Sequence, residues 1–232
     1  LFTNSIIKNF SLYQKQSKLS MKKLENKRKT ILRDSKNFST HQIKQLLDDC
    51  KIFGTLHFSK MARIAFIATA ILKSLESKKL VDSYFIENFM GTIQTPLSEF
   101  QDDLLLLKNN KITKNSFLKK YGHLRPGTYD ISALRYDQQT QIFNEKFITK
   151  NFKSKKHVSL NSKTLKKIYD AGLVFENIEP LEFFKQALVL REQLKFEFTK
   201  NLSESLELIK NFSKLHKLPI NDICNLTINE IL

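Results

Sequence analysis

The sequence is poor in the residues that form turns. Five glycines and four prolines occur among 232 residues, about 4% of the chain against about 12% on average. Sandwiches, barrels and glycine-loop nucleotide folds need many such residues, so these classes are disfavoured. Composition is otherwise globular, with 41% hydrophobic and 27% charged residues, which excludes a mostly disordered chain. The sequence therefore predicts long helices and an all-α fold.

Residue patterns of metal sites and disulfide frameworks are also missing. The two cysteines, Cys50 and Cys224, lie far apart, and the five histidines are scattered. The patterns GxGxxG, GxxxxGK[ST], HExxH and GxSxG do not occur. We therefore predict no metal site and no disulfide, and a reducing, cytoplasmic location.

The sequence has no long hydrophobic run. The longest uncharged apolar stretch is IAFIATAIL, residues 64–72, between Arg63 and Lys73. A membrane-spanning helix needs about 20 such residues, so the stretch indicates a buried helix and no membrane partner is expected. The numbering starts without methionine or a signal peptide, and we expect a fragment of a longer protein.

Charge of one sign predominates, because 39 Lys and Arg residues face 23 Asp and Glu residues for a net charge of +16. A basic helical module that binds nucleic acid is therefore the alternative function. The basic tracts Lys15–Arg33 and Lys146–Lys167 lack a clear platform of aromatic residues for base stacking. Most charge runs are solvated faces, so nucleic acid is the less favoured partner.

Helical spacing and capping residues divide the chain into about eight helices in one domain, residues 1–232. Gly54 is expected to break the chain before a long helix, and Gly122 and Gly172 to end two others in the position after the last helical residue. Helical periodicity is lost from His123 to about Asn161, so short strands are an alternative between residues 123 and 160. The predicted helices are 1–34, 40–51, 57–75, one opened by Thr95 and Pro96, 116–121, 162–171, 180–200, 203–216 and 220 to the end.

The segment Tyr121–Asp137 (YGHLRPGTYDISALRYD) is the most polar part of the chain. Pro126 and Gly127 fit the central positions of a type II turn. Arg125 precedes proline, so we expect an extended backbone that displays its side chain. Two interpretations remain open: a binding loop whose guanidinium groups hold a carboxylate or phosphate, or a surface loop held together by Arg–Asp pairs.

Two helices carry cations where apolar residues are expected. Arg63 lies in a helix with apolar residues on both faces, and a buried guanidinium there would need an anion. Arg191 and Lys195 interrupt an apolar stripe that runs from Leu181 to Leu202. The alternatives are snorkelling at a helix edge and an internal ion pair, with Glu192 or Asp130 as the acid.

Several segments in order resemble the central helical part of phosphoenolpyruvate-synthase-like phosphotransferases. They are CKIFGTLHFSKMARIAFIA (50–68), FLKKYGHLRPGTYDISALRYD (117–137) and REQLKFEFTKNLSESLELI (191–209), followed by LTINEIL (226–232). The segment GHLRPGTYDI is most similar to the branch of L-glutamine kinases of capsular phosphoramidate biosynthesis. His57 departs from the family pattern, which has proline in the TLxF motif.

In that family an ATP-grasp domain uses ATP to phosphorylate a carrier histidine, which passes the phosphoryl group to an acceptor on the middle domain. This chain has neither the ATP-grasp phosphate loop nor the threonine–x–histidine context of the carrier. The resemblance thus implies an acceptor-binding domain with no cofactor of its own, whose ATP and Mg²⁺ bind the ATP-grasp domain. The implied reaction forms L-glutamine phosphate, AMP and phosphate, whereas related branches phosphorylate pyruvate or other small molecules. The isolated chain is expected to be inactive.

L-Glutamine is a zwitterion, so its site needs a cation, an anion and an uncrowded amide. We expect Arg63 and Arg125 to hold the carboxylate or phosphoryl group, with Arg135 next, and Asp130 to hold the ammonium. His123 and Tyr129 are the candidate catalytic residues, which orient the amide or transfer a proton. The remaining candidate substrate-binding residues are Thr128, Arg191 and Lys195.

Overall fold

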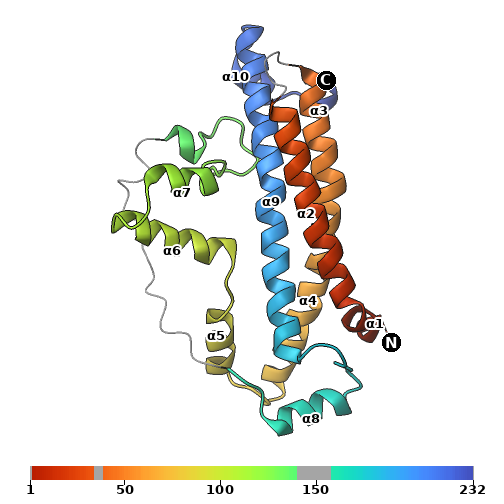
Figure 1. Ribbon diagram of the computed structural model, residues 1–232. Helices are drawn as coiled ribbons and strands as arrows, with labels where there is room; N and C mark the ends of the chain where they lie inside the picture. Colours follow the sequence, from red (N-terminus) through yellow and green to blue (C-terminus); the bar gives the residue numbers. More distant parts are fainter. Residues whose placement is uncertain (1, 34–38, 140–157, 232) are drawn as a thin grey trace. The chain divides into compact units, whose positions relative to one another are not determined.

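The computed structural model describes residues 2–33, 39–139 and 158–231, and all regular secondary structure in these ranges is helical (Figure 1). The predicted all-α class is therefore confirmed. No strand occurs in the described part of the segment 123–160, where only the short helical turn η2 (Tyr136–Gln138) forms. Residues 140–157, which include most of the second basic tract, lie outside the described residues.

The chain forms two compact units that interleave along the sequence. Unit 1 comprises Leu1–Leu19, His57–Pro96 and Lys150–Leu194, and unit 2 comprises Ser20–Leu56, Leu97–Thr149 and Lys195–Leu232. Because each unit is built from three segments that alternate along the chain, no single boundary divides the sequence. The expectation of one domain stays a prediction.

Unit 1 has an aromatic core. The rings of Phe10 and Phe183 meet edge to face with centroids 4.8 Å apart, and Phe175 packs edge-on against Phe183 and Phe184. These side chains are buried, and such pairs add to the stability that burial supplies. The helices of unit 1 are α1 (Phe2–Lys8), the first part of α2 (Phe10–Arg33), most of α4 (Leu56–Ser77), α5 (Ser83–Gly91), α8 (Ser162–Asp170) and the first part of α9 (Pro180–Leu215).

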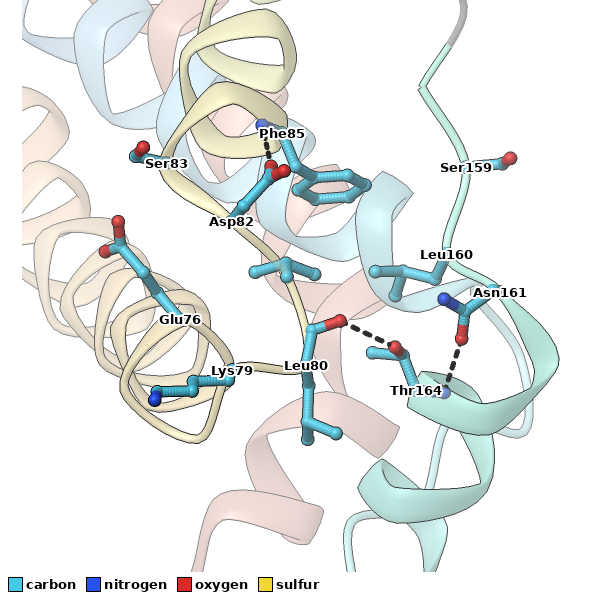
Figure 2. A pocket seen from close by; sticks show the side chains of 11 residues that line it. Glu76, Lys79, Leu80, Asp82, Ser83, Phe85, Ser159, Leu160, Asn161 and Thr164 are labelled. Carbon is cyan, nitrogen blue, oxygen red and sulfur yellow. Dashed lines mark hydrogen bonds between the residues drawn. The ribbon is translucent and has the colours of Figure 1, made fainter.

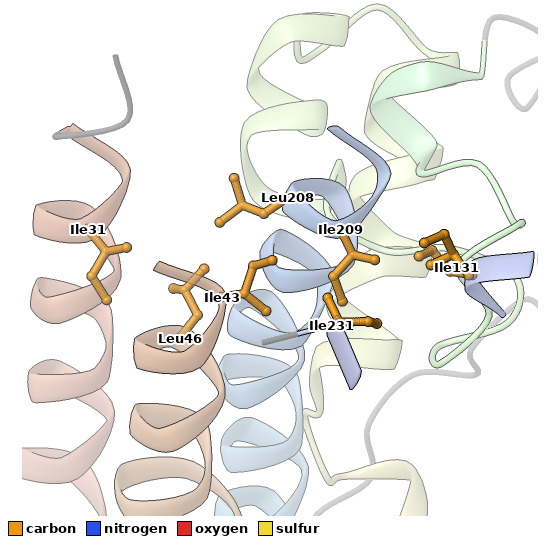
Figure 3. Packing of buried hydrophobic residues seen from close by; sticks show 8 residues of the cluster. Ile31, Ile43, Leu46, Ile131, Leu208, Ile209 and Ile231 are labelled. Atoms are coloured by element: carbon orange, nitrogen blue, oxygen red, sulfur yellow. The ribbon is translucent and has the colours of Figure 1, made fainter. Parts of the chain in front are cut away.

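Unit 2 has an aliphatic core at the C-terminal part of α9 (Figure 3). Ile31 of α2, Ile43 and Leu46 of α3 and Leu208 and Ile209 of α9 are buried in this cluster. A second cluster joins Leu104, Phe117 and Tyr121 of two further helices. The remaining helices of unit 2 are α3 (Thr40–Asp49), η1 (Cys50–Thr55), α6 (Pro96–Lys108), α7 (Lys114–Tyr121), α10 (Ile220–Ile223) and α11 (Ile228–Ile231).

Gly54 does not break the chain, contrary to the prediction. It lies in η1, a π-helical turn in which the Leu56 N–H donates to the Lys51 carbonyl, so α3 continues into α4. A Cβ on Gly54 would come 2.5 Å from Cβ of Phe198. The glycine therefore serves close helix packing rather than chain reversal.

The break predicted between residues 200 and 203 is also wrong, because α9 is one helix of 36 residues. Asn201, Ser203 and Ser205 are buried. The Asn201 side chain accepts from Arg28 at 2.9 Å and donates to the Leu46 carbonyl at 3.2 Å, and the Ser205 hydroxyl donates to the Asn201 carbonyl. Partners inside unit 2 thus satisfy side chains that usually mark helix ends.

The turn predicted at Gly127 is wrong, whereas α7 and α8 end before Gly122 and Gly172 as predicted, with a left-handed glycine only at Gly172. Gly122 caps α7 in the right-handed helical region (φ −57°). Gly127 does not adopt the positive φ that a type II turn requires; instead the Asp130 N–H donates to the Gly127 carbonyl at 3.0 Å. Gly172, after α8, has the expected left-handed conformation (φ 79°).

The continuous helix Thr40–Ser77 is long and apolar enough to cross a membrane by length and composition alone. A core helix of a soluble protein passes the same test. In the α4 part, Met61, Ile64 and Ala68 are buried, whereas the face that carries Phe66 is exposed. Both faces of α4 are therefore apolar as predicted, but only one of them is covered.

Candidate functional site

The polar loop is fastened to α9 by Arg125. This side chain is only 1% exposed. It donates to the carbonyls of Asp130 and Ala133 within the loop, and to Ser203 Oγ (3.1 Å) and Glu207 Oε1 (3.0 Å) on α9. The expectation of a displayed side chain is therefore wrong, because the guanidinium is buried against α9 within unit 2.

Arg135 makes the second attachment of the loop. Its guanidinium forms a bidentate pair with Asp137 (3.1 and 2.7 Å) and a further bond to Glu204 of α9 (2.8 Å). Burial opposes the charge, but the two carboxylates outweigh burial and raise the pKa of Arg135. The interpretation of a loop held by Arg–Asp pairs is thus confirmed for Arg135, with acids of α9 as additional partners.

Glu207 is the shared acceptor of this network. Besides Arg125 it accepts from Gln138 at 2.6 Å and lies 3.5 Å from Lys210. Burial would raise the pKa of this carboxyl group, but Gln138, Lys210 and the two arginines stabilise the anion and lower the pKa. Both arginines of the loop therefore already have anionic partners within the protein.

His123 is buried at the base of the loop, 8% exposed, with its ring edge-on to Phe196. Its carbonyl accepts from the Ser203 hydroxyl at 2.7 Å, and Nε2 is buried without a hydrogen-bond partner. Burial, reinforced by nearby cations, lowers the pKa of His123 to about 3. A neutral, enclosed imidazole is a weak base without access to solvent, so this placement argues against proton transfer by His123.

The tip of the loop is the part that faces solvent. Tyr129 is 70% exposed, and Thr128 lies beside it in the turn that starts at Gly127. Asp130 is exposed, but one carboxylate oxygen accepts from the Ser132 N–H (2.8 Å) and hydroxyl (2.6 Å). These bonds lower the pKa of Asp130. Among the predicted residues of the loop, Tyr129 and Asp130 are exposed and Thr128 is half-buried.

The three remaining predicted cations lie elsewhere on α4 and α9. Arg63 is exposed, so the argument that it must find an anion is wrong: water solvates it. Arg191 contacts the Phe66 ring face (5.7 Å) and pairs with Glu192 (3.3 Å), which confirms the ion-pair alternative. Lys195 is exposed. Arg63 and Arg191 belong to unit 1, whereas the loop belongs to unit 2.

Sequence reasoning missed Arg28, a buried cation of unit 2. Its guanidinium donates to Asn201 at 2.9 Å, and burial lowers its pKa. The position is part of a basic tract, which suggests a solvated face. The signal that could have found it is the helical register of Leu24, Arg28 and Ile31, three buried residues on one side of α2.

A cavity of about 580 Å³ lies in unit 1, between the end of α4, the start of α5 and the start of α8 (Figure 2). None of its residues had been predicted as functional. Thr164 closes one wall, because its buried hydroxyl donates to the Leu80 carbonyl at 2.9 Å. Charged and polar side chains line the opening: Glu76, Lys79, Asp82, Ser83 and Asn161.

The cavity differs from the loop because the side chains of Glu76 and Lys79, two of its three charged groups, lack partners within the described residues. Asp82 caps α5 by accepting from the Phe85 N–H at 2.7 Å, and Asn161 caps α8 by accepting from the Thr164 N–H at 2.8 Å. Within the described residues, the side chains of Glu76 and Lys79 form no ion pair or hydrogen bond. This arrangement can bind a polar small molecule without breaking contacts of the fold.

No group of three or more histidine, cysteine, aspartate or glutamate side chains that could hold a metal ion occurs in the described residues. No protein-family model, curated protein or solved structure matches the chain. The resemblance to phosphoenolpyruvate-synthase-like phosphotransferases therefore stays a prediction, carried by the residues quoted for it.

Proposed function

We propose that this chain is the acceptor-binding part of an ATP-dependent phosphotransferase that transfers a phosphoryl group to the amide nitrogen of L-glutamine. The observation that carries the proposal is a convergence in unit 2. Cys50 donates to the Phe198 carbonyl, Gly54 packs on the Phe198 side chain, and the loop arginines bind Ser203, Glu204 and Glu207. Parts of all three segments that carry the resemblance thus meet on one stretch of α9.

The loop arginines act as positioning residues in this proposal. Their charges are already paired, and an arginine held by a carboxylate has little capacity left for the carboxylate of a ligand. They keep the loop in one conformation, so that Thr128 and Tyr129 present hydroxyl groups at its tip. A fixed hydroxyl can orient an amide for attack on a phosphoryl group, which lowers the entropic part of the barrier.

The other components of the reaction belong to other domains of the same polypeptide. An ATP-grasp domain holds ATP and Mg²⁺, and a carrier histidine brings the phosphoryl group to the acceptor. The role of this chain is to bind and orient L-glutamine. No cofactor site is required in unit 1 or unit 2.

A thermal-shift titration of the purified chain tests the choice of acceptor. L-Glutamine should raise the melting temperature with concentration, because a ligand of the folded state stabilises it by about RT ln(1 + [L]/Kd). Pyruvate and amino sugars should leave it unchanged. A shift with pyruvate alone would favour a related kinase of another substrate, and the chain by itself should form no AMP from ATP and L-glutamine.

The loop tip is tested in the polypeptide that carries all three domains. Tyr129→Phe should lower glutamine-dependent AMP formation at least tenfold, about 1.4 kcal/mol of transition-state stabilisation. Phosphorylation of the carrier histidine by ATP should persist. Tyr169→Phe, which removes the hydroxyl of another exposed tyrosine, in unit 1, is the control. Equal rates in the two variants would remove Tyr129 from the site.

A further inference from the structure

We infer that the cavity of unit 1 binds a small zwitterion of the α-amino-acid class through Lys79, Glu76 and Asp82. The inference goes beyond the proposed function, because the cavity belongs to unit 1 whereas the loop tip belongs to unit 2. It uses the proposed function only for the choice of L-glutamine as the first probe. The loop of unit 2 offers no comparable set of charges, since its arginines are paired.

The charges at the cavity suit a ligand that carries both signs. Lys79 supplies one ammonium group for a carboxylate, and Glu76 and Asp82 supply carboxylates for an ammonium. Glu76 and Lys79 extend from the end of α4, while Asp82 lies at the start of α5 (Figure 2). Two carboxylates and one lysine at the opening contrast with the net charge of +16 of the chain. An ordinary solvated face of this protein would be basic.

The uncharged groups at the cavity suit the side chain of an amino acid. Asn161 uses its carbonyl oxygen to cap α8, so its amide N–H groups remain available as donors. The Ser83 hydroxyl is also available. Leu80, Phe85 and Leu160 supply apolar surface for methylene groups (Figure 2). Most small-molecule sites combine apolar walls with a few polar groups in this way.

The backbone at Lys79 permits a variant that separates binding from stability. Lys79 has a left-handed conformation (φ 55°) at the end of α4, where its N–H donates to the Glu76 carbonyl and the Leu80 N–H to the Leu75 carbonyl. Glycine is the residue preferred at such a position. Lys79→Gly therefore removes the ammonium group while it keeps or improves the fold.

Calorimetric titration of the 232-residue chain tests the inference. L-Glutamine should bind at least tenfold more tightly than butyrate or butylamine, which each carry one of its two charges. Lys79→Gly and Glu76→Gln should each weaken L-glutamine binding at least tenfold. The matched controls Lys78→Gln and Glu87→Gln, which change exposed charges of the same type outside the cavity, should bind as the wild type does.

The possible results distinguish the cavity from the proposed function. If wild type and both cavity variants bind L-glutamine equally, the inference is overturned and the acceptor assignment survives. If the cavity binds another amino acid, with the same loss in Lys79→Gly, the inference stands with that amino acid as the ligand, and the identity of the acceptor is decided by AMP formation in the whole polypeptide. Failure of every zwitterion to bind overturns the inference, while glutamine-dependent AMP formation by the whole polypeptide still decides the proposed function.

Discussion

The polar loop of unit 2 and the cavity of unit 1 both gather charged side chains, but the charges are used differently. Arg125 is buried and paired with Glu207, and Arg135 is half-buried and paired with Glu204 and Asp137. Lys79 and Glu76 are exposed at an opening and unpaired in the described chain. The comparison teaches that two guanidinium groups in one motif do not by themselves make an anion site. Whether an arginine can bind a ligand depends on how many of its N–H groups are already used by partners within the protein.

Arg125→Ala should give the largest effect on stability. The substitution leaves the Glu207 carboxylate and two loop carbonyls without this donor, and loss of one partner of a buried pair costs about 3–5 kcal/mol. For a chain of this size that is a fall of roughly 10 °C in melting temperature. The exposed Arg63→Ala, measured by the same denaturation, should change stability by no more than about 0.5 kcal/mol.

The two units should also differ in how they tolerate one added methyl group. Gly54→Ala in unit 2 places Cβ against Phe198 and should destabilise by about 1–3 kcal/mol. Gly91→Ala at the end of α5 meets nothing within 4 Å and should stabilise by about 0.5–1 kcal/mol. Urea unfolding of both variants measures the difference, and equal values would contradict the tight packing of η1.

His123 should make unit 2 sensitive to mild acid. Its pKa is about 3 in the folded protein and about 6.5 when unfolded, so the unfolded state binds the proton first as pH falls. Stability is therefore lost on acidification, by about 2 kcal/mol between pH 7 and pH 5. His123→Phe should remove this part of the pH dependence. Unfolding curves measured at pH 7 and pH 5 for the wild type and His123→Phe test this. An equal loss of stability in both proteins would contradict an enclosed imidazole.

The smallest effect belongs to the cavity. Lys79→Gly relieves a left-handed non-glycine residue and should stabilise the chain by up to about 1 kcal/mol. A rise in melting temperature without ligand, measured beside Lys78→Gly as control, checks this. If Lys79→Gly destabilises the fold, the lysine side chain has contacts that hold unit 1 together, and the contrast with the loop weakens.

Composition and helical spacing predicted the all-α fold and most helix starts. The scarcity of glycine and proline excluded other classes, and Pro96 and Pro180 stand at the first residues of α6 and α9, as expected. The helix α5 was not predicted, since its nine residues (SYFIENFMG) have little helical pattern of their own. Its start depends on the Asp82 cap.

The candidate site was less predictable because its properties depend on distant partners. Arg125 precedes a proline, but its contacts with α9 bury it. Arg63 lies between apolar residues, but it is on the exposed side of α4 and is solvated. Asn201 and Ser203 suggested a helix end. Inside the helix they are satisfied by partners far away in sequence, Arg28 and Leu46 for Asn201 and Arg125 and His123 for Ser203. The cavity was missed because its residues come from two distant segments, 76–85 and 159–164, with no common motif.

The two thiols of the protein should react with alkylating reagents on different schedules. Cys50 donates its thiol to the Phe198 carbonyl and is buried, and burial raises its pKa to about 11. At pH 8 only about one molecule in a thousand would carry the thiolate, the reactive form. Cys224 is exposed and should be modified at once. A single label can thus be attached at α10 of the wild-type chain, and the slow second labelling, at Cys50, would time how often the packing of η1 on α9 opens.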